Sequence, residues 1–302
     1  MTKRILFLVY RKKVAFRSPP SDPFAPASFM LTHPQFDPVA FSVGPFSARW
    51  YGLTYLFAFI CFAVLGRLRA RRRPELGWNA QSVDDMLFYG IFGVIFGARL
   101  GEILFFQPAH YFTHPTEIFS IWKGGMSFHG GFLGVLIAMW FYSRRHGRSF
   151  WEVTDFIAPM IPIGLAAGRI GNFINGELCG RLASETLPWA IRYPWPWIDD
   201  LPRHPSQLYQ AAGEGLLLFI LLWWFASRPR PPRMVSGLFL VGYGTLRFIA
   251  EFFRTPDPGI FSELGLGWTT AQWLCLPMAV VGAYLIVRAL IIGSNRQQAS
   301  LL

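Results

Sequence analysis

Charged residues are scarce in this sequence. Of its 302 residues, 15% are charged and 53% are hydrophobic, whereas an ordinary soluble domain carries about 25% charged residues. This composition excludes a typical soluble globular protein, because the chain is too apolar and too sparsely charged for one. It predicts instead an all-α polytopic membrane protein.

Cysteine is also rare, and familiar catalytic motifs are missing. Cys61, Cys179 and Cys275 are far apart and odd in number, which indicates small apolar filler rather than a disulfide framework or a metal site. The sequence contains no Gly-x-Ser-x-Gly elbow, His-Glu-x-x-His pair, phosphate loop or Cys-x-x-Cys pair, which removes several hydrolase, metalloenzyme and NTPase interpretations. We therefore expect neither a metal nor a soluble cofactor.

The sequence also lacks long basic tracts and repeats of fixed period. Its net charge is +11, but the basic residues fall in short clusters between apolar runs, as the positive-inside rule expects for membrane proteins. Nucleic-acid binding is therefore not expected. The missing repeat excludes a solenoid and gives an inverted-repeat transporter no support.

Seven apolar segments are predicted to be transmembrane helices. They are residues 50–65, 86–106, 126–142, 151–174, 207–226, 235–253 and 271–292. Arginine clusters follow the first, third and fifth segments, whereas the loop after the second segment carries a single lysine. Because cytoplasmic loops are enriched in Lys and Arg, this pattern predicts an outer, periplasmic amino end and a cytoplasmic carboxyl end.

Two stretches lie outside these spans. Residues 1–29 combine six basic residues with a Pro/Ser-rich stretch, and their one apolar run is too short for a signal core or a span. We predict a disordered or non-native extension, with a start at Met30 and a seven-helix domain over residues 30–302. Residues 180–203 are rich in Trp, Tyr and Pro. Because Trp and Tyr favour the headgroup level, this stretch is predicted to form a small periplasmic head segment.

The densest group of polar residues closes the fourth span. Residues 168–181 read GRIGNFINGELCGR. Charged side chains at the bilayer centre cost about 3 kcal/mol each, so they normally face a bundle interior and mark a functional site. Arg169 and Asn172 share a helix face, whereas Glu177 follows Gly176, where we expect the helix to end. Such a place can present an arginine fork and backbone donors to a phosphate.

A second group of polar residues lies on the sixth span. Tyr243, Arg247, Glu251 and Arg254 stand at spacings of four, four and three, which places them on one helical stripe. Arg247 and Glu251 can form a purely structural ion pair, but the additional arginine favours an anion site. With Arg169, Arg247 is predicted to form a two-arginine clamp at the outer membrane face.

Three further candidates lie where spans begin. His129 opens the third span, and the two glycines after it are predicted to leave room for a substrate. Histidine titrates near neutral pH and suits a general base, although a histidine at a helix start is more often a structural hydrogen-bonding group. Tyr51 begins the first span, where an aromatic residue is by default part of the interfacial belt. His204 precedes the fifth span, and we expect it to be structural, with Ser206 as a helix cap.

Taken together, these motifs resemble those of the bacterial prolipoprotein diacylglyceryl transferase family. The resemblance runs from about residue 37 to the final helix and includes the motifs at residues 49–52, 129–131, 168–181, 204–209 and 247–257. It implies transfer of the diacylglyceryl group of phosphatidylglycerol to the lipobox cysteine that follows a prolipoprotein signal peptide. That reaction forms a thioether, releases glycerol phosphate and begins lipoprotein maturation. We expect a monomer in the bacterial inner membrane, surrounded by membrane lipid.

The resemblance also implies which residues form the site. The implied catalytic residues are His129, Arg169, Arg247, Glu177, Glu251, Tyr51 and Tyr243. The implied phosphatidylglycerol-binding residues are Arg169, Asn172, Gly180, Arg247 and Arg254. Two positions depart from the pattern, because Gln210 stands where the family often has glutamate and Cys179 where a bulkier aromatic residue is usual.

The expected chemistry needs a stabilised phosphate leaving group and a thiolate nucleophile. We expect the two arginines of the clamp to hold the phosphate, with Glu177 and Glu251 orienting them. Asn172 and the tyrosines are expected to position the head group. His129 is expected to accept the thiol proton.

Two other classes of function remain open. The same arginines could bind an anionic solute in a transporter or channel, or the protein could be a structural membrane scaffold. A transporter would distribute polar residues along a path through both leaflets, whereas here they gather near the outward ends of the spans. This asymmetry favours an interfacial enzyme that opens sideways to lipid.

Overall fold

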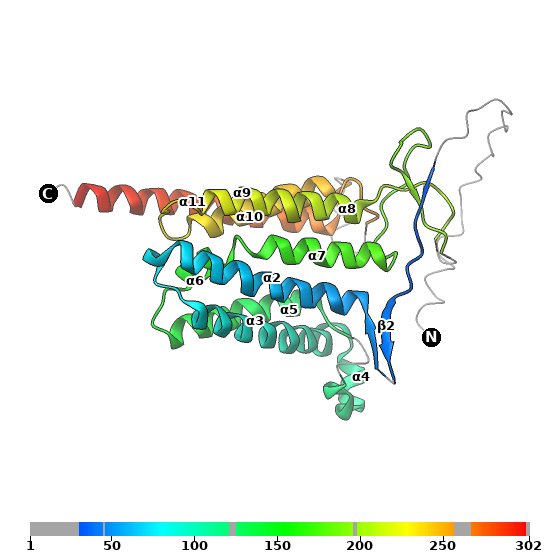
Figure 1. The fold of residues 1–302 in the computed structure, drawn as a ribbon, viewed down its shortest axis with the longest axis horizontal. Helices are drawn as coiled ribbons and strands as arrows, with labels where there is room; N and C mark the ends of the chain where they lie inside the picture. Colours follow the sequence, from blue (N-terminus) through cyan, green and yellow to red (C-terminus); the bar gives the residue numbers. More distant parts are fainter. Residues whose placement is uncertain (1–29, 45, 121–124, 196–197, 257–266, 300–302) are drawn as a thin grey trace.

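The fold is a bundle of helices that run side by side along the long axis of the molecule (Figure 1). The computed structural model describes residues 30–44, 46–120, 125–195, 198–256 and 267–299. The extension predicted at residues 1–29 lies outside the described residues.

The described helices and strands follow one another in this order. The α-helices are α2 (Trp50–Arg72), α3 (Ala80–Gly101), α4 (Pro108–Thr113), α5 (Phe128–Arg145), α6 (Phe150–Ile157), α7 (Ile161–Ile174), α8 (Ser206–Gln210), α9 (Leu218–Phe225), α10 (Met234–Ala250) and α11 (Thr270–Ala299). Two π-helical segments, η2 (Glu102–Phe106) and η5 (Ala211–Leu217), continue α3 and α8. Two 3-10 turns, η1 (Pro74–Leu76) and η3 (Pro115–Phe119), lie in loops. The strands are β1 (Leu31–Thr32), β2 (Val39–Val43), β3 (Phe46–Arg49) and β4 (Ile191–Arg192).

Every predicted span is helical, but not all of them are long and apolar enough to cross a membrane. Within the described residues four helices meet that requirement: α2, α3 with most of η2, the run Ser206–Phe225, and α11. Counting α6 and α7 as one broken span gives five. Helix α10 has 17 residues, which corresponds to about 26 Å against a hydrocarbon core of about 30 Å. The chain is therefore a multi-pass helical membrane protein.

The fourth predicted span is a bent pair of helices rather than one continuous helix. The chain breaks between α6 and α7, and the two axes differ by 52°. Pro162 lies in the first turn of α7. A proline at that place cannot donate to the carbonyl four residues earlier, and its ring clashes with that carbonyl, so a continuous helix is disfavoured.

The carboxyl end of the sixth predicted span also differs from the expectation. Helix α10 ends at Ala250, so Arg254 lies beyond the helix, where it forms an isolated antiparallel bridge with Gly180. The stripe of polar residues therefore continues from a helix into a short extended segment. This bridge ties the end of α10 to the segment that follows α7.

Glycines hold α3 against α5. A Cβ added at Gly101 would lie 2.8 Å from the Cα of Gly130, and one added at Gly97 would lie 2.7 Å from the Cα of Gly134. Only glycine permits such a close backbone approach. Gly130 was predicted to leave room for a substrate beside His129, and this prediction was wrong, because the space is filled by α3.

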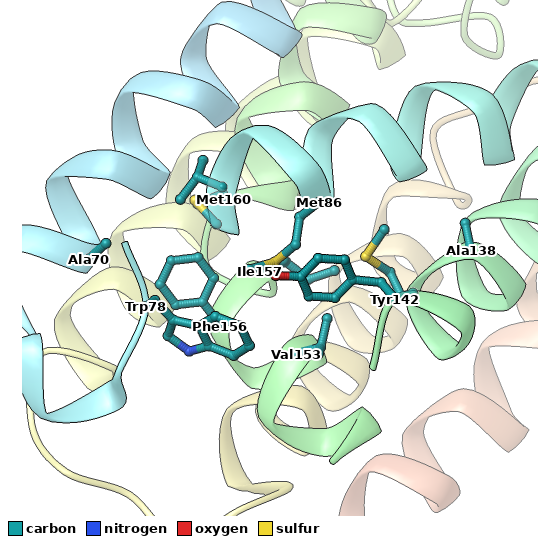
Figure 2. Close-up of a cluster of buried hydrophobic side chains, with 11 residues drawn as sticks. Ala70, Trp78, Met86, Ala138, Tyr142, Val153, Phe156, Ile157 and Met160 are labelled. Atoms are coloured by element: carbon teal, nitrogen blue, oxygen red, sulfur yellow. The ribbon is translucent and has the colours of Figure 1, made fainter. Parts of the chain in front are cut away.

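Arginine-rich loops and a buried apolar cluster lie at one end of the bundle. Trp78, Tyr142 and Phe156 are fully or almost fully buried there, together with Met86 and Met160 (Figure 2). Aromatic side chains of this size bury about 150–250 Å² each and dominate such a contact. This cluster fixes the corner where α2, α3, α5 and α6 meet.

The opposite end carries the predicted head segment. Strand β4 pairs in parallel with β1, joining Ile191 to Leu31. Cys179 and Tyr193 are buried beneath it, and burial raises the pKa of the Cys179 thiol to about 11. The described part of residues 180–203 thus lies at the end of the bundle that carries β2, β3 and α4 (Figure 1).

Candidate active site

Two arginines from different helices meet at one buried carboxylate. Helix α7 carries Arg169 and helix α10 carries Arg247, while Glu214 lies between them on the π-helical segment η5. Arg169 Nη2 is 3.8 Å from Glu214 Oε2, and Arg247 Nη1 is 3.6 Å from Glu214 Oε1. Glu214 is only 1% exposed. The predicted two-arginine pairing is therefore built around a glutamate that bridges both guanidinium groups.

A second buried carboxylate extends this group along α10. Arg247 Nη2 is 2.9 Å from Glu251 Oε2, and Arg254 Nη1 is 3.5 Å from Glu251 Oε1. Glu251 is also only 1% exposed. The polar stripe predicted from spacing is thus a chain of alternating charges. We call the three arginines and two glutamates of this chain, Arg169, Glu214, Arg247, Glu251 and Arg254, the arginine cluster.

The arginine cluster has a net positive charge, because it contains three guanidinium groups and two carboxylates. Arg247 Nη1 is buried and has no hydrogen-bond acceptor among the described residues. Its contact with Glu214 is an ion pair without a hydrogen bond. Unsatisfied buried donors are costly. An anion that accepts this N–H would remove that cost.

Glu177 does not take the place expected for it. It was predicted to orient the arginines, but in the described structure Arg169 pairs with Glu214 instead. Helix α7 ends at Ile174, and Gly176 turns the chain at a φ of +65°. Glu177 is exposed beyond this turn and accepts a hydrogen bond from Asn172 Nδ2 at 3.4 Å. The helix end near Gly176 is as predicted.

The tyrosines lie on the two helices that flank α7 and the arginines. The Tyr51 ring approaches Gly171, where an added Cβ would lie 3.1 Å from Tyr51 Cδ2. Tyr51 also interacts electrostatically with Arg169 and Glu177. Tyr243 interacts electrostatically with both Arg169 and Arg247. Tyr51 therefore lies beside α7, and Tyr243 lies one helical turn before Arg247 on α10.

Gly180 is held against backbone. Its N–H donates to the His204 carbonyl at 3.0 Å, and the next N–H, of Arg181, donates to Phe253 at 2.9 Å. A Cβ at Gly180 would lie 2.6 Å from the Phe253 oxygen. A glycine is therefore required here for the head to approach the end of α10.

His129 comes from a different part of the bundle. It lies in the first turn of α5, two residues after the cap Ser127, and its side chain is exposed. Helix α5 packs on α3 through the glycines described above, whereas the arginine cluster is built by α7, η5 and α10. Its role as a base stays a prediction.

Glu214 was missed by the sequence analysis. The sequence analysis considered only Gln210, the position where the family often has glutamate. Gln210 and Glu214 are both buried and lie one helical turn apart. The signal that could have found Glu214 was a lone carboxylate within an apolar segment, which is expected to be functional by default. Although Gln210 replaces the glutamate that the family often has, the site still contains a carboxylate, Glu214, one helical turn further along the chain.

Apolar spanning helices around a buried, net positive cluster define a multi-pass membrane protein with an internal polar site. The sequence model of the prolipoprotein diacylglyceryl transferase family matches residues 38–288, and this chain belongs to that family. The resemblance inferred from the motifs is thereby confirmed.

Similar proteins carry the same name. The phosphatidylglycerol–prolipoprotein diacylglyceryl transferase of Azoarcus sp. (strain BH72) is 70% identical over 260 residues, covering 86% of this chain and 97% of that protein. The protein of that name from Aromatoleum aromaticum is 70% identical over 257 residues, covering 85% and 97%. The one from Dechloromonas aromatica is 58% identical over 260 residues, covering 86% and 98%.

Proposed function

We propose that this protein transfers the diacylglyceryl group of phosphatidylglycerol to the lipobox cysteine of a prolipoprotein. A C–S bond forms at the terminal glycerol carbon, the C–O bond to the phosphate breaks, and glycerol phosphate leaves with the bonding electrons. The observation that carries the proposal is the bridge from Arg169 through Glu214 to Arg247, inside a membrane protein of the transferase family.

The arginines bind the phosphate and stabilise its developing charge. Guanidinium groups match phosphate oxygens with two parallel N–H donors. The Arg247 Nη1 donor is buried and unpaired by hydrogen bonds among the described residues, so it is available to a phosphate oxygen. In a site of low dielectric constant such a donor stabilises a leaving group more strongly than it would in water.

The glutamates hold the arginines in position. Glu251 ion-pairs Arg247 at 2.9 Å, and Glu214 spans the gap between α7 and α10. Guanidinium groups held in this way need little reorganisation when charge develops, which is how preorganised sites lower barriers. Asn172 and the two tyrosines complete the wall that faces the head group.

The thiol must lose its proton before it attacks. A thiolate is the nucleophilic form of cysteine, and we propose that His129 accepts the proton and passes it to solvent. The exposed position of His129 at the start of α5 suits exchange with solvent and with an incoming peptide.

We further propose seven spans in the inner membrane, with a periplasmic head and amino end and a cytoplasmic carboxyl end. The count adds α5, α10 and the bent pair α6–α7 to the four long apolar helices. The arginine-rich loops would then face the cytoplasm, as the positive-inside rule expects. The proposed partners are phosphatidylglycerol and the prolipoprotein signal peptide, and the enzyme is proposed to act as a monomer without a cofactor.

Transfer of label tests the proposal. Purified protein in detergent is incubated with phosphatidylglycerol radiolabelled in its acyl chains and with a lipobox peptide whose cysteine is reduced. Label should appear on the peptide with wild type and with Arg145→Gln, a control at the opposite end of the bundle. It should be lost with Arg247→Ala and with His129→Ala. Absence of transfer by folded wild type would reject the enzyme and direct attention to anion uptake in liposomes.

A further inference from the structure

A groove that the proposed reaction does not use runs along the contact between α5 and α6. Its apolar part has a volume of about 220 Å³ and is lined by Leu136, Ile137, Trp140 and Phe150. Its polar part has a volume of about 310 Å³ and shares Trp140 and Phe150 with the first. Because two lining residues are common, the two hollows adjoin on the same face, and we call them together the groove.

The groove changes from apolar to basic along its length. Arg144, Arg148, Ser149 and Trp151 line the polar part. On α5 the apolar Leu136 and the basic Arg144 are eight residues apart, which corresponds to about 12 Å along the helix axis. Tryptophans favour the membrane–water interface. A groove that is apolar toward the bundle centre and basic at the level of the tryptophans is complementary to a phospholipid, whose acyl chains are apolar and whose phosphate is anionic.

The two arginines of the groove differ in how they are held. Arg148 donates to the carbonyls of Leu76 at 3.2 Å and Gly77 at 2.6 Å, and lies 3.9 Å from Glu152. Arg144 is exposed and stacks on Trp140, its guanidinium carbon 5.5 Å from the ring centre. Among the described residues no carboxylate pairs with Arg144. Arg144 is therefore the groove's available cation.

A third cation adds to the positive field. Arg233, at the start of α10, stacks on Trp151 with its guanidinium carbon 5.7 Å from the ring centre. Two acidic residues adjoin these cations. Glu152 lies 3.9 Å from Arg148, the distance of a weak ion pair, and Asp155 accepts a hydrogen bond from the Arg233 backbone N–H at 2.6 Å. The groove is thus net positive where it meets the interface.

We propose that this groove binds an anionic phospholipid from the leaflet at the arginine-rich end of the bundle. One acyl chain lies along Leu136, Ile137 and Phe150, and the phosphate accepts hydrogen bonds from Arg144. Basic pockets between membrane helices are known binding places for anionic head groups. This lipid is separate from the substrate, because the arginine cluster lies toward the head, at the far end of α7 and α10. The proposal does not depend on the transferase activity.

Photolabelling tests the groove directly. The protein is reconstituted in nanodiscs with a trace of phosphatidylglycerol that carries a diazirine in its acyl chain, and labelled peptides are mapped by mass spectrometry. Wild type should be labelled within residues 136–151. Arg144→Gln should lower this labelling at least fivefold, whereas Arg145→Gln, which removes the same charge from the neighbouring position outside the groove, should leave it unchanged. Arg144→Lys, which keeps the charge, should retain most of it.

Competition identifies the class of lipid. Excess unlabelled phosphatidylglycerol should displace the probe from the groove, whereas phosphatidylcholine with the same chains and free glycerol phosphate should not. Equal competition by phosphatidylcholine, or equal labelling of wild type and Arg144→Gln, would overturn the proposal. Loss of labelling in both Arg144→Gln and Arg144→Lys would show that the positive charge at residue 144 does not bind the lipid, which would also contradict the proposal.

A catalytic variant separates this site from the transferase site. Arg247→Gln should lose transfer to the lipobox peptide and keep the labelling of residues 136–151, while Arg144→Gln should do the reverse. If Arg247→Gln lost both transfer and the labelling of residues 136–151, the groove would belong to the substrate path, and the proposal of a separate site would be overturned.

Discussion

Arg99 and Arg247 are two buried arginines with opposite surroundings. They are 6% and 9% exposed, so burial does not distinguish them. Arg99 donates to the backbone carbonyls of Ile118 at 2.8 Å and Gly125 at 2.9 Å, and its guanidinium carbon lies 4.9 Å from the Tyr111 ring centre. It therefore fixes the loop that leads from α3 to α5.

Arg247 is surrounded by carboxylates rather than by carbonyls. Glu251 and Glu214 face it from two elements, and one of its N–H groups has no hydrogen-bond acceptor in the part of the chain that is described. At the arginine-rich end Arg69 and Arg73 both donate to the Ala226 carbonyl, but Arg69 Nε has no acceptor among the described residues and Arg73 also pairs with Glu75. Arg99, whose donors meet backbone carbonyls, therefore holds the fold, whereas Arg247, held by ion pairs and with a spare donor, is ready for an anion.

The largest effect is expected from changing the shape of the Arg247 side chain while keeping its charge. Arg247→Lys should lower kcat/KM for lipid transfer by about 10³-fold, because an ammonium group cannot provide two parallel donors to a phosphate. The measurement is label transfer in detergent, with Arg145→Gln as the control. Near-normal transfer by Arg247→Lys would mean that the reaction needs only the positive charge at residue 247 and not the two parallel donors of the guanidinium.

Glu214→Gln should produce the next largest effect. The variant keeps the shape of the side chain but removes the charge that joins the two arginines, so kcat should fall by about 10²-fold through misplaced donors. KM for phosphatidylglycerol should stay the same or fall, because the site becomes more positive. The measurement is a KM and kcat determination with varied lipid.

A charge transplant provides the control for Glu214. Adding Gln210→Glu to Glu214→Gln returns a carboxylate one turn away, at the position where the family often has one. The double variant should recover part of kcat. A Glu214→Gln enzyme with unchanged kcat, or one whose apparent kcat falls only in proportion to the lost folded fraction, would reduce Glu214 to a structural ion pair.

Arg99→Gln should affect stability rather than chemistry. Removing the guanidinium leaves buried carbonyls without donors and should cost roughly 3 kcal/mol. The apparent Tm in detergent should fall, while kcat/KM per folded molecule should stay close to wild type. If Arg99→Gln instead keeps its Tm and loses activity, the distinction between the two kinds of buried arginine fails.

The sequence allowed the local parts of this comparison to be predicted. The spacing of Tyr243, Arg247 and Glu251 placed them on one face of a helix, and the ion pair between the last two is present. The end of α7 near Gly176 was also expected, because glycine commonly ends a helix. Periodicity carries this information, since each such feature depends on residues a few positions apart.

Contacts between distant segments were not predictable in the same way. Glu214 joins α7 to α10 across about 30 to 45 positions of sequence, and no spacing rule pairs charges on different helices. Gly130 was assigned to substrate space because its partner Gly97 lies on another helix. The break before Pro162 was not predicted, although a proline within an apolar segment indicates a possible break in the helix.

The smallest expected effect concerns the contact that holds the end of α7 beside the arginine cluster. His33 directly follows β1 and is buried, and its Nε2 donates to the Phe173 carbonyl at 2.7 Å while Nδ1 accepts from the Gln35 N–H at 3.1 Å. Both nitrogens are thus used by the neutral ring. Burial lowers the pKa of His33 below its ordinary value of 6.5. The Tyr193 and Trp195 rings around it carry no charge near neutral pH.

The sign of the resulting pH dependence follows from this lowered pKa. Just below pH 6.5, His33 binds a proton in the unfolded chain but stays neutral in the folded protein. The stability that His33 contributes is therefore present above pH 6.5 and is lost as the pH falls. The apparent Tm should therefore fall as the pH is lowered from about 7.5 to about 5. His33→Gln, which keeps a donor for the Phe173 carbonyl but cannot titrate, should show a flatter plot of apparent Tm against pH than wild type. Parallel plots for the two proteins would mean that protonation of His33 does not affect the stability of the contact at the end of α7.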